Sequence, residues 1–262
     1  MKKLDILTPV GLLGAIGMVF FGIISAGASM ASFIDVASIV ITLGGSLFAV
    51  LATFPLSDIS GIPKALQLAM FETNLNKVDL VGQFKDIVKK VRTEGVLSLE
   101  ASMAEIENDF LRQGLGYVVD GMDPELTKSI METEIAMMEM RYGISAKIFK
   151  LWGSFCPAFG MVGTLIGLVN MMGDVSDANK VAMGMAAALL TTFYGSLLAN
   201  GIFNPIGYNI DIKAEKEAVL MEMIMAGVIS IQREDSMPTL EASLICFLDD
   251  KDKKTFEDGG GA

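Results

Sequence analysis

Four runs of sequence without a charged side chain constrain the fold of this chain more than any other feature. They cover residues 6–34, 36–57, 151–173 and 181–210, and Asp35 alone separates the first two. Each run is long enough to cross a hydrocarbon core of roughly 30 Å as a helix. Apolar residues make up 52% of the 262-residue chain, more than an ordinary soluble domain carries. The pattern therefore predicts an all-α integral membrane protein with four transmembrane helices in two hairpins, and it disfavours a soluble helical core.

The basic residues predict how the chain is oriented. If residues 28–35 and 174–180 are the external loops, Lys180 is the only one of the 20 Lys and Arg residues that lies outside. The positive-inside rule then places both termini and residues 55–150 in the cytoplasm. The net charge of −11 makes nucleic acid an unsuitable partner.

Helical periodicity continues outside the four runs and suggests four parts of the chain. These are a first transmembrane hairpin (1–54), a cytoplasmic helical domain (55–150), a second transmembrane hairpin (151–206), and a cytoplasmic helix with a disordered tail (207–262). At the start of the cytoplasmic domain, apolar residues recur at helical spacing at Ile59, Ile62, Leu66 and Met70. This stripe fits an amphipathic helix lying on the membrane surface, or simply the first cytoplasmic helix.

Within the cytoplasmic domain, one helix is predicted around residues 80–91 and a second over residues 99–110. Gly95 lies between the two helices. Asp123-Pro124-Glu125 has the composition of a helix start, with a capping side chain, a first-turn proline and an acid that suits the helix dipole. Because no helix breaker follows before Gly143, we expect long cytoplasmic extensions of the third and, after Pro205, the fourth membrane helix.

The composition excludes several kinds of chemistry. The chain has no histidine, so imidazole catalysis and histidine metal ligation are impossible. A glycine-rich phosphate loop and a serine nucleophile motif are also missing, and we expect neither an enzyme nor a bound metal or cofactor. Cys156 falls in a membrane run and Cys246 in the tail, which predicts two packing residues and no disulfide.

Small residues and hydroxyls mark the third and fourth runs. Gly160, Gly163 and Gly167 share a face beside Thr164, and Gly184, Ala188, Thr191 and Gly195 repeat at intervals of three and four. Small residues at this spacing let helices approach closely, and threonines usually bond to a nearby carbonyl or helix. The arrangement predicts a surface that packs a partner's helix and offers oxygens to a cation or to water.

The absence of carboxylates from these runs is equally informative. Proteins that move protons or sodium through a membrane generally need an ionisable ligand at depth. Asp, Glu, Lys and Arg are absent from all four runs. If the chain conducts ions, another chain must therefore supply the carboxylate.

Two segments carry a resemblance to a known family. The stretches CPAFGMVGTLIGLVNMM and ALLTTFYGSLLANGIFNPI, together with VRTEGVLSLE in the cytoplasmic part, are similar to the flagellar stator proteins MotA/PomA of the MotA/TolQ/ExbB superfamily. The resemblance covers nearly the whole chain. A TolQ/ExbB-type energiser of an envelope protein is the alternative, but that group typically lacks the first hairpin.

The resemblance implies an assembly and a task. A homopentamer in the bacterial cytoplasmic (inner) membrane would surround two copies of a MotB/PomB-type subunit with one transmembrane helix. That subunit would supply the ion-binding aspartate and a peptidoglycan-binding domain. Flow of H⁺ or Na⁺ would rotate the ring and apply torque to the rotor protein FliG.

The resemblance also assigns residues. Pro157 and Pro205 match the family's two prolines that couple ion binding to conformational change, although a plain structural kink explains them as well. The ion path is assigned to Thr164 and Thr192, with Thr191 beside them, and engagement of FliG to Arg92 and Glu100. A threonine at position 164 is typical of sodium-driven stators, but hydroxyls also support a proton-carrying water chain, so both ions remain open.

Overall fold

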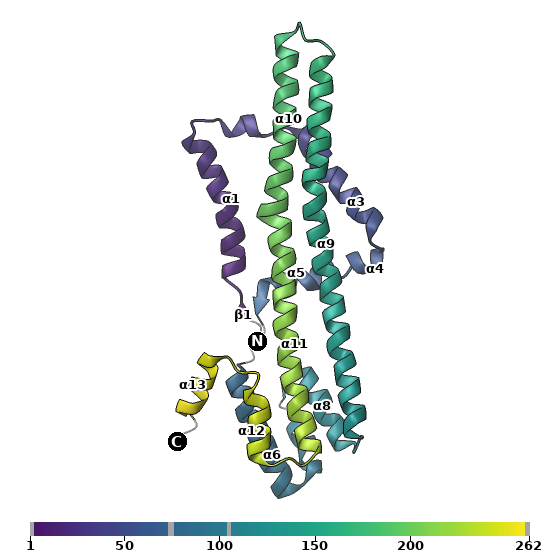
Figure 1. Ribbon diagram of the computed structural model, residues 1–262, viewed down its shortest axis with the longest axis vertical. Helices are drawn as coiled ribbons and strands as arrows, with labels where there is room; N and C mark the ends of the chain where they lie inside the picture. Colours follow the sequence, from purple (N-terminus) through teal and green to yellow (C-terminus); the bar gives the residue numbers. More distant parts are fainter. Residues whose placement is uncertain (1–2, 73–75, 104–105, 260–262) are drawn as a thin grey trace. The chain divides into compact units, whose positions relative to one another are not determined.

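The structure is a computed structural model that describes residues 3–72, 76–103 and 106–259 (Figure 1). It forms two compact units, each described here by itself. The first, called the hairpin unit, comprises residues Lys2–Glu72 and Arg141–Lys213. The second, called the helical unit, comprises mainly Thr73–Met140 and Ala214–Ala262. Helices α9 (Pro124–Met172) and α11 (Asn204–Gln232) contribute to both.

Four helical segments among the described residues are long and apolar enough to cross a membrane, which confirms the predicted fold class. The amino-terminal part of the hairpin unit contains β1 (Lys3–Leu4), α1 (Leu7–Ser25), the 3-10 helix η1 (Met30–Phe33), α2 (Val36–Ile39), the π-helical turn η2 (Val40–Gly44), α3 (Gly45–Thr53), α4 (Leu56–Ile59), α5 (Ile62–Met70) and β2 (Phe71–Glu72). The second hairpin consists of α9, α10 (Ala178–Leu198), the π-helical turn η4 (Ala199–Phe203) and the start of α11.

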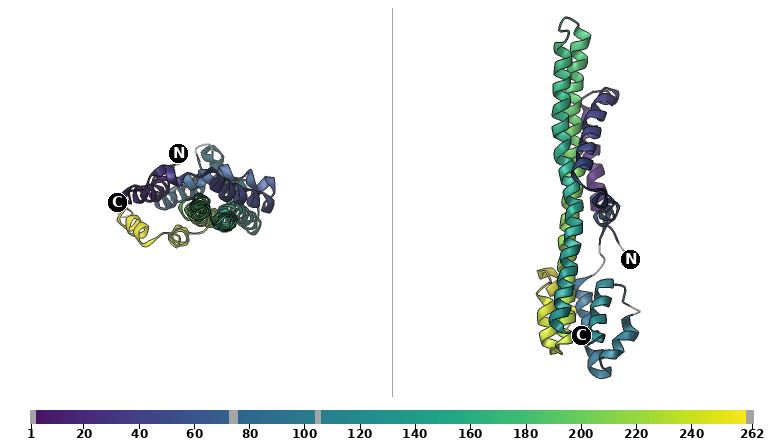
Figure 2. Two further views of the ribbon diagram at one scale, coloured as in Figure 1. Left: turned by 90° about the horizontal axis from the view of Figure 1, so that it is seen from above. Right: turned by 90° about the vertical axis from the view of Figure 1, so that its right-hand side faces the viewer.

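Helices α9 and α10 lie side by side (Figures 1 and 2). The turn between them ends at Asp177, whose carboxylate accepts the backbone N–H groups of Asn179 (2.9 Å) and Lys180 (3.3 Å) and so caps α10. A core of small and aromatic side chains connects α5 to this hairpin. It comprises Ala65, Ala69, Ala146, Phe149, Cys156, Ala199, Phe203 and Ile210.

The burial of Ala65 and Ala69 differs from the predicted boundary between the first hairpin and the cytoplasmic domain, at residues 54 and 55. Residues 55–72 belong to the hairpin unit and not to a separate cytoplasmic domain, because α5 packs on α9 and on the segment after α10. Met70 of the predicted apolar stripe is exposed, and the two alanines form the buried side of the helix instead.

The first hairpin has two unlike members. Helix α1 has a single buried residue, Ile23, and a Cβ at Gly11, Gly14 or Gly17 would meet nothing within 4 Å. The second span, by contrast, packs closely, since a Cβ at Gly45 would lie 2.3 Å from the Phe159 ring. Helix α1 is therefore the loosely packed member of the first hairpin, and the second span is the closely packed one.

Two hydrogen bonds of Tyr194 determine where along α10 the first hairpin contacts the second. Tyr194 lies near the carboxyl-terminal end of α10. Its hydroxyl donates to the carbonyl of Phe33 and accepts the N–H of Asp35 at 3.0 Å. Asp35 in turn caps α2 by accepting the N–H of Ser38 at 2.8 Å. The loop between the first two spans thus meets α10 about 24 Å along the helix from its start at Ala178, at 1.5 Å per residue.

The helical unit contains α6 (Lys77–Glu94), the 3-10 helix η3 (Val96–Ser98), α7 (Leu99–Met103), α8 (Asp109–Val119), α12 (Met237–Ile245) and α13 (Asp250–Gly259). Its core is formed by apolar faces of α6 and α8, by Met131 of α9, and by Met223 and Ile224 of α11. Phe84 reaches this core because Gly227 has no side chain; a Cβ there would lie 2.4 Å from the ring.

Several local predictions for the helical unit are confirmed and two are wrong. Gly95 ends α6 with a φ of 84°, and Asp123 caps α9 by accepting the N–H of Glu125 at 2.9 Å. The predicted helix over residues 99–110 is two helices, because Asn108 starts α8 by accepting the N–H of Leu111 at 2.8 Å. The predicted disordered tail is helical to Gly259 in α13.

Candidate functional site in the second hairpin

Glycines bring the backbones of α9 and α10 into direct contact. A Cβ at Gly160 would lie 2.7 Å from the carbonyl oxygen of Thr191, and one at Gly167 would lie 2.6 Å from that of Gly184. A Cβ at Gly195 would lie 2.7 Å from the carbonyl oxygen of Cys156. No side chain fits at these positions without moving a helix.

This contact corrects the prediction that the small residues face a partner's helix. The six residues named for partner-helix packing are all buried within the chain's own hairpin: Gly160, Gly163, Gly167, Gly184, Ala188 and Gly195. A stripe of small residues predicts a close helix pair but not which helix approaches. Here the neighbouring helix of the same chain occupies the stripe.

Close approach of the backbones places two threonine hydroxyls together. Oγ1 of Thr164 lies 2.6 Å from Oγ1 of Thr192, and both lie near the Ala188 carbonyl oxygen, at 3.0 Å and 3.3 Å. Thr164 is half-buried and Thr192 is exposed. Three oxygens therefore converge at the surface of the hairpin, from neighbouring turns of two helices.

The chemistry of this cluster follows from its proton count. The two hydroxyls hold two protons between them, whereas each oxygen also has acceptor lone pairs. The Gly160 carbonyl can accept the proton of Thr164 at 3.1 Å, and the Ala188 carbonyl can accept that of Thr192 at 3.3 Å. Lone pairs on both hydroxyl oxygens then remain for a cation or a water molecule. None of these oxygens carries a charge, so the cluster needs a carboxylate from elsewhere to bind a cation tightly.

Thr191 does not belong to this cluster. It is buried, and its methyl group occupies the space beside Gly163, where a Cβ would lie 2.4 Å from Thr191 Cγ2. Its hydroxyl donates to the carbonyl of Ala188 at 3.1 Å. Its own carbonyl accepts the hydroxyl of Thr42 in the second span at 3.4 Å. The structure therefore separates Thr191, a packing residue, from Thr164 and Thr192.

The second span contains a row of buried hydroxyls that was not predicted from the sequence. Ser38, Thr42 and Ser46 are 1%, 0% and 0% exposed and recur at intervals of four. Ser38 donates to the Ala187 carbonyl at 3.4 Å, and Ser46 accepts the indole N–H of Trp152 at 3.1 Å. An interval of four residues places the three hydroxyls on one face of a helix, and this spacing is visible in the sequence. The sequence does not show which helix packs against that face.

Both predicted coupling prolines lie within helical segments. Pro157 is inside α9, seven residues or about 10 Å before Thr164. Pro205 lies in the first turn of α11, directly after the π-helical turn η4. Each proline removes a backbone N–H donor and frees the carbonyl four residues earlier. The π-helical turn before Pro205 is a local change in winding at the position where proline favours one.

A small cavity adjoins the second of these breaks. Its volume is about 200 Å³, and Thr8, Asn200, Gly201, Pro205 and Asn209 are among its lining residues. The cavity places the polar side chains of Thr8 in α1 and Asn209 in α11 beside Pro205. The segment around Pro205 is thus less tightly packed than the glycine contact above it.

The predicted rotor residues lie in the helical unit. Arg92 is exposed in the last turn of α6, and its Nη2 donates to the carbonyl of Asp235 at 2.6 Å. It lines a cavity of about 630 Å³ together with apolar residues that include Val96 and Ile231. Glu100 is exposed in the first turn of α7. The side chain of Arg92 therefore has a partner within the chain, whereas the surface position of Glu100 suits an external contact.

Outside the spans, one ion pair shapes the turn between α9 and α10. Lys180 Nζ lies 2.9 Å from Oδ2 of Asp174, and Ser176 donates to the same carboxylate at 2.7 Å. The hydrogen bond from Lys180, followed by that from Ser176, holds the pKa of Asp174 below its usual value. The carboxylate is partly exposed and marks a hydrated end of the hairpin.

These features define a class of protein: a polytopic membrane protein whose second hairpin presents hydroxyl oxygens and no carboxylate. Residues 102–223 match the model of the MotA/TolQ/ExbB proton channel family. Relatives that match nearly the whole chain agree with that assignment, and the chain belongs to this family.

Two relatives and one solved structure illustrate the similarity. The chain is 39% identical to the uncharacterized protein YtxD of Bacillus subtilis (strain 168), over 94% of this chain and 92% of the relative. It is 33% identical to motility protein A of Treponema pallidum (strain Nichols), over 97% and 98%. The flagellar MotAB stator complex from Bacillus subtilis contains a chain with a TM-score of 0.88 and 28% identity, covering 95% of this chain and 98% of that one.

Proposed function

We propose that this chain is the A subunit of a flagellar motor stator, which converts a cation gradient into rotation and applies torque to the rotor. The observation that carries the proposal is the cluster of Thr164, Thr192 and the Ala188 carbonyl on the exposed side of the second hairpin. This cluster is half of an ion site, because the spans supply oxygens but no charge. The relatives named motility protein A support the same function.

The missing half of the site implies the partner. A single transmembrane helix with an aspartate, as in a MotB/PomB-type subunit, would add the carboxylate beside the threonines. Family resemblance suggests two such helices inside a ring of five A subunits in the cytoplasmic membrane, with both termini in the cytoplasm. The solved relative is a MotAB complex, which supports a partner of this type.

The proposed coupling uses the two prolines. Moving one charge through 100 mV releases roughly 2.3 kcal/mol, which suffices for a small helix displacement but not for unfolding. Pro157 and Pro205 interrupt the backbone hydrogen bonds of α9 and α11. Along the sequence, each proline lies between a threonine of the hydroxyl cluster and the residues of the helical unit. Displacement there would reach Arg92 and Glu100, which we propose act at the contact with the rotor protein FliG.

We propose Na⁺ as the transported ion, because converging hydroxyl and carbonyl oxygens are ligands suited to a hard cation. The test is torque on tethered cells that lack their own stators and express this chain with its partner. Sodium and pH are varied independently. Torque that follows sodium at constant pH supports the proposal, and torque that follows pH alone identifies H⁺. Cells that never rotate under any gradient would reject the stator function itself.

The hydroxyl cluster is tested by Thr192→Val, which keeps the shape of the side chain and removes one oxygen. We expect ion-driven rotation to be impaired while the complex still assembles in the membrane. Thr53→Val is a matched control, because the Thr53 hydroxyl is exposed in the second span and donates only to the Ala49 carbonyl at 2.8 Å. Normal swimming of the Thr192→Val variant would remove Thr192 from the ion path.

A further inference from the structure

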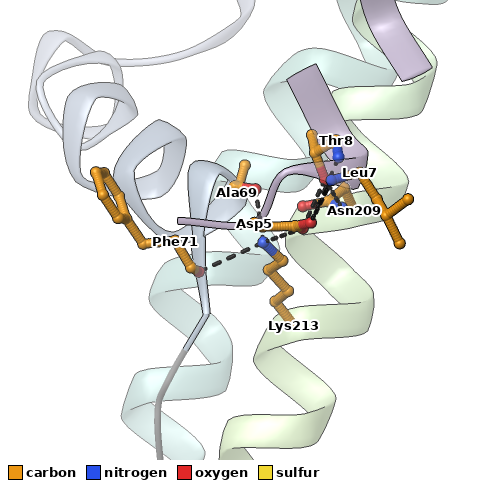
Figure 3. Close-up of polar contacts among 7 residues, drawn as sticks. All are labelled: Asp5, Leu7, Thr8, Ala69, Phe71, Asn209 and Lys213. Atoms are coloured by element: carbon orange, nitrogen blue, oxygen red, sulfur yellow. Dashed lines mark hydrogen bonds and ion pairs between the residues drawn. The ribbon is translucent and has the colours of Figure 1, made fainter. Parts of the chain in front are cut away.

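Lys213 of α11, eight residues beyond Pro205, forms a buried ion pair with Asp5. Nζ of Lys213 is 2.7 Å from Oδ2 of Asp5, and the two side chains are only 11% and 9% exposed (Figure 3). The ammonium also donates to the carbonyls of Ala69, at 2.7 Å, and Phe71, at 3.4 Å. All three donors of the lysine therefore have acceptors, which is what a buried ammonium requires.

Both carboxylate oxygens of Asp5 likewise have hydrogen-bond donors. Its Oδ1 accepts the backbone N–H groups of Leu7, at 3.1 Å, and Thr8, at 3.4 Å, and so caps the start of α1. Its Oδ2 accepts the Thr8 hydroxyl at 2.7 Å in addition to Lys213. One carboxylate thus starts the first membrane helix and neutralises a lysine of the last one.

Two further contacts extend this arrangement. The amide Nδ2 of Asn209, one turn before Lys213, donates to the Thr8 hydroxyl at 2.9 Å. The backbone N–H of Asp5 donates to the carbonyl of Met70 at 3.0 Å, next to the pairing of β1 with β2. Three segments that are far apart in the sequence meet here: the residues before α1, the end of α5, and the first three turns of α11. We call this group of contacts the amino-terminal anchor.

The position of the anchor relative to Pro205 gives it a role. Pro205 and the π-helical turn before it make the winding of this helix locally irregular, whereas Lys213 is held from three directions about 12 Å further along. A helix that is irregular at one position and fixed two turns later moves, beyond that position, together with whatever holds it. Here that is the start of α1 and the end of α5.

We propose that Asp5 and Lys213 are positioning residues that make α11 beyond Pro205, the start of α1 and α5 move as one piece, so that helix displacement on ion passage becomes torque. The inference rests on the proposed stator function and adds residues that touch neither the ion nor the rotor. A change in the ion path should alter the ion current. A change in these two residues should instead alter the torque produced per unit of current.

The experiment uses the complete stator, co-expressed with its partner in cells without other stators. Asp5→Asn keeps the size and the cap of α1 but leaves the lysine without its counter-charge, and Lys213→Met removes the ammonium. Lys213→Arg keeps a positive charge and several hydrogen-bond donors at the same place. Membrane abundance, ion current and torque are measured for each variant.

We expect Asp5→Asn and Lys213→Met to lose torque while abundance and ion current are retained, and Lys213→Arg to retain part of the torque. Two controls define the background. Lys216→Met removes an exposed lysine from the same helix, and Asp211→Asn breaks the ion pair with Lys150, whose side chains are about one third exposed. Both should leave the ratio of torque to current unchanged.

Three results would overturn the inference. Unchanged torque in Asp5→Asn and Lys213→Met is the first. Parallel loss of abundance, current and torque in the single variants is the second, because it would show a residue needed only for folding. A Lys213→Arg variant with no more torque than Lys213→Met, although its abundance is retained, is the third. Failure of the unaltered chain to produce torque would instead reject the proposed function.

Discussion

Gly167→Ala tests the physical basis of the hydroxyl cluster with a single methyl group. The added Cβ would lie 2.6 Å from the Gly184 carbonyl oxygen and 2.9 Å from the Ala188 nitrogen. Both atoms are backbone, so no flexible side chain can move aside. Restoring an ordinary contact of 3.4 Å requires α9 and α10 to separate locally by about 0.8 Å, the difference between 3.4 and 2.6 Å.

This separation has two measurable consequences. Overpacking of this kind costs about 1–3 kcal/mol of stability. It also lengthens the contact from Thr164 Oγ1 to the Ala188 carbonyl from 3.0 Å to about 3.8 Å, beyond hydrogen-bond range. Ion-driven rotation should therefore fall together with thermal stability, although residue 167 presents no polar atom to the ion.

The assay compares thermal unfolding of the detergent-solubilised complex with swimming speed. Gly11→Ala is the matched control, because a Cβ there meets nothing within 4 Å on a helix that also spans the membrane. It should leave both quantities unchanged. If Gly167→Ala is as stable and as motile as the unaltered chain, the hydroxyls do not depend on close contact of the two backbones and the reasoning fails.

Two other predictions concern charged groups. The hydrogen bond from Lys213, with those from Thr8, lowers the pKa of Asp5 from 3.8 to about 2. Its contribution of about 2 kcal/mol to stability is present above pH 3.8 and is lost as the pH falls towards 2; acid unfolding of the Asp5→Asn variant should lack this component. Arg92→Glu should weaken rotor engagement but spare ion current, whereas Arg92→Lys should retain more torque; loss of membrane assembly would make the bond to Asp235 structural.

Charge-free runs and helix caps predicted the fold well, because both signals are formed by residues that are close together in the sequence. The length of a run decides whether it spans the bilayer, and Asp123 before Pro124 was enough to locate the start of a 49-residue helix. The break at Asn108 was harder to see, since an apolar face continues on both sides of it. The capping bond from Leu111 to Asn108 shows where the second of the two helices begins.

The candidate site was only partly predictable for a different reason. Thr191 and Thr192 are adjacent in the sequence and chemically identical, yet a rotation of about 100° between them directs one to Gly163 and the other to Thr164. Which of them faces outward depends on the partner helix. The Asp5–Lys213 pair was hidden too, because 207 intervening residues separate two charges that the sequence presents as ordinary flanks of membrane runs.

The contact of Tyr194 with Phe33 and Asp35 has a consequence for the surrounding lipid. It sets the loop between the first two spans level with Tyr194 of α10, so about 24 Å of the second hairpin extends beyond that level. That part still exposes apolar side chains such as Val169, Met183 and Leu189. A flat bilayer matched to α1 would leave them in water, at a cost for every ångström of mismatch. The membrane must therefore be thicker beside the second hairpin than beside α1, or other protein must take the place of lipid around the part of the hairpin beyond Tyr194.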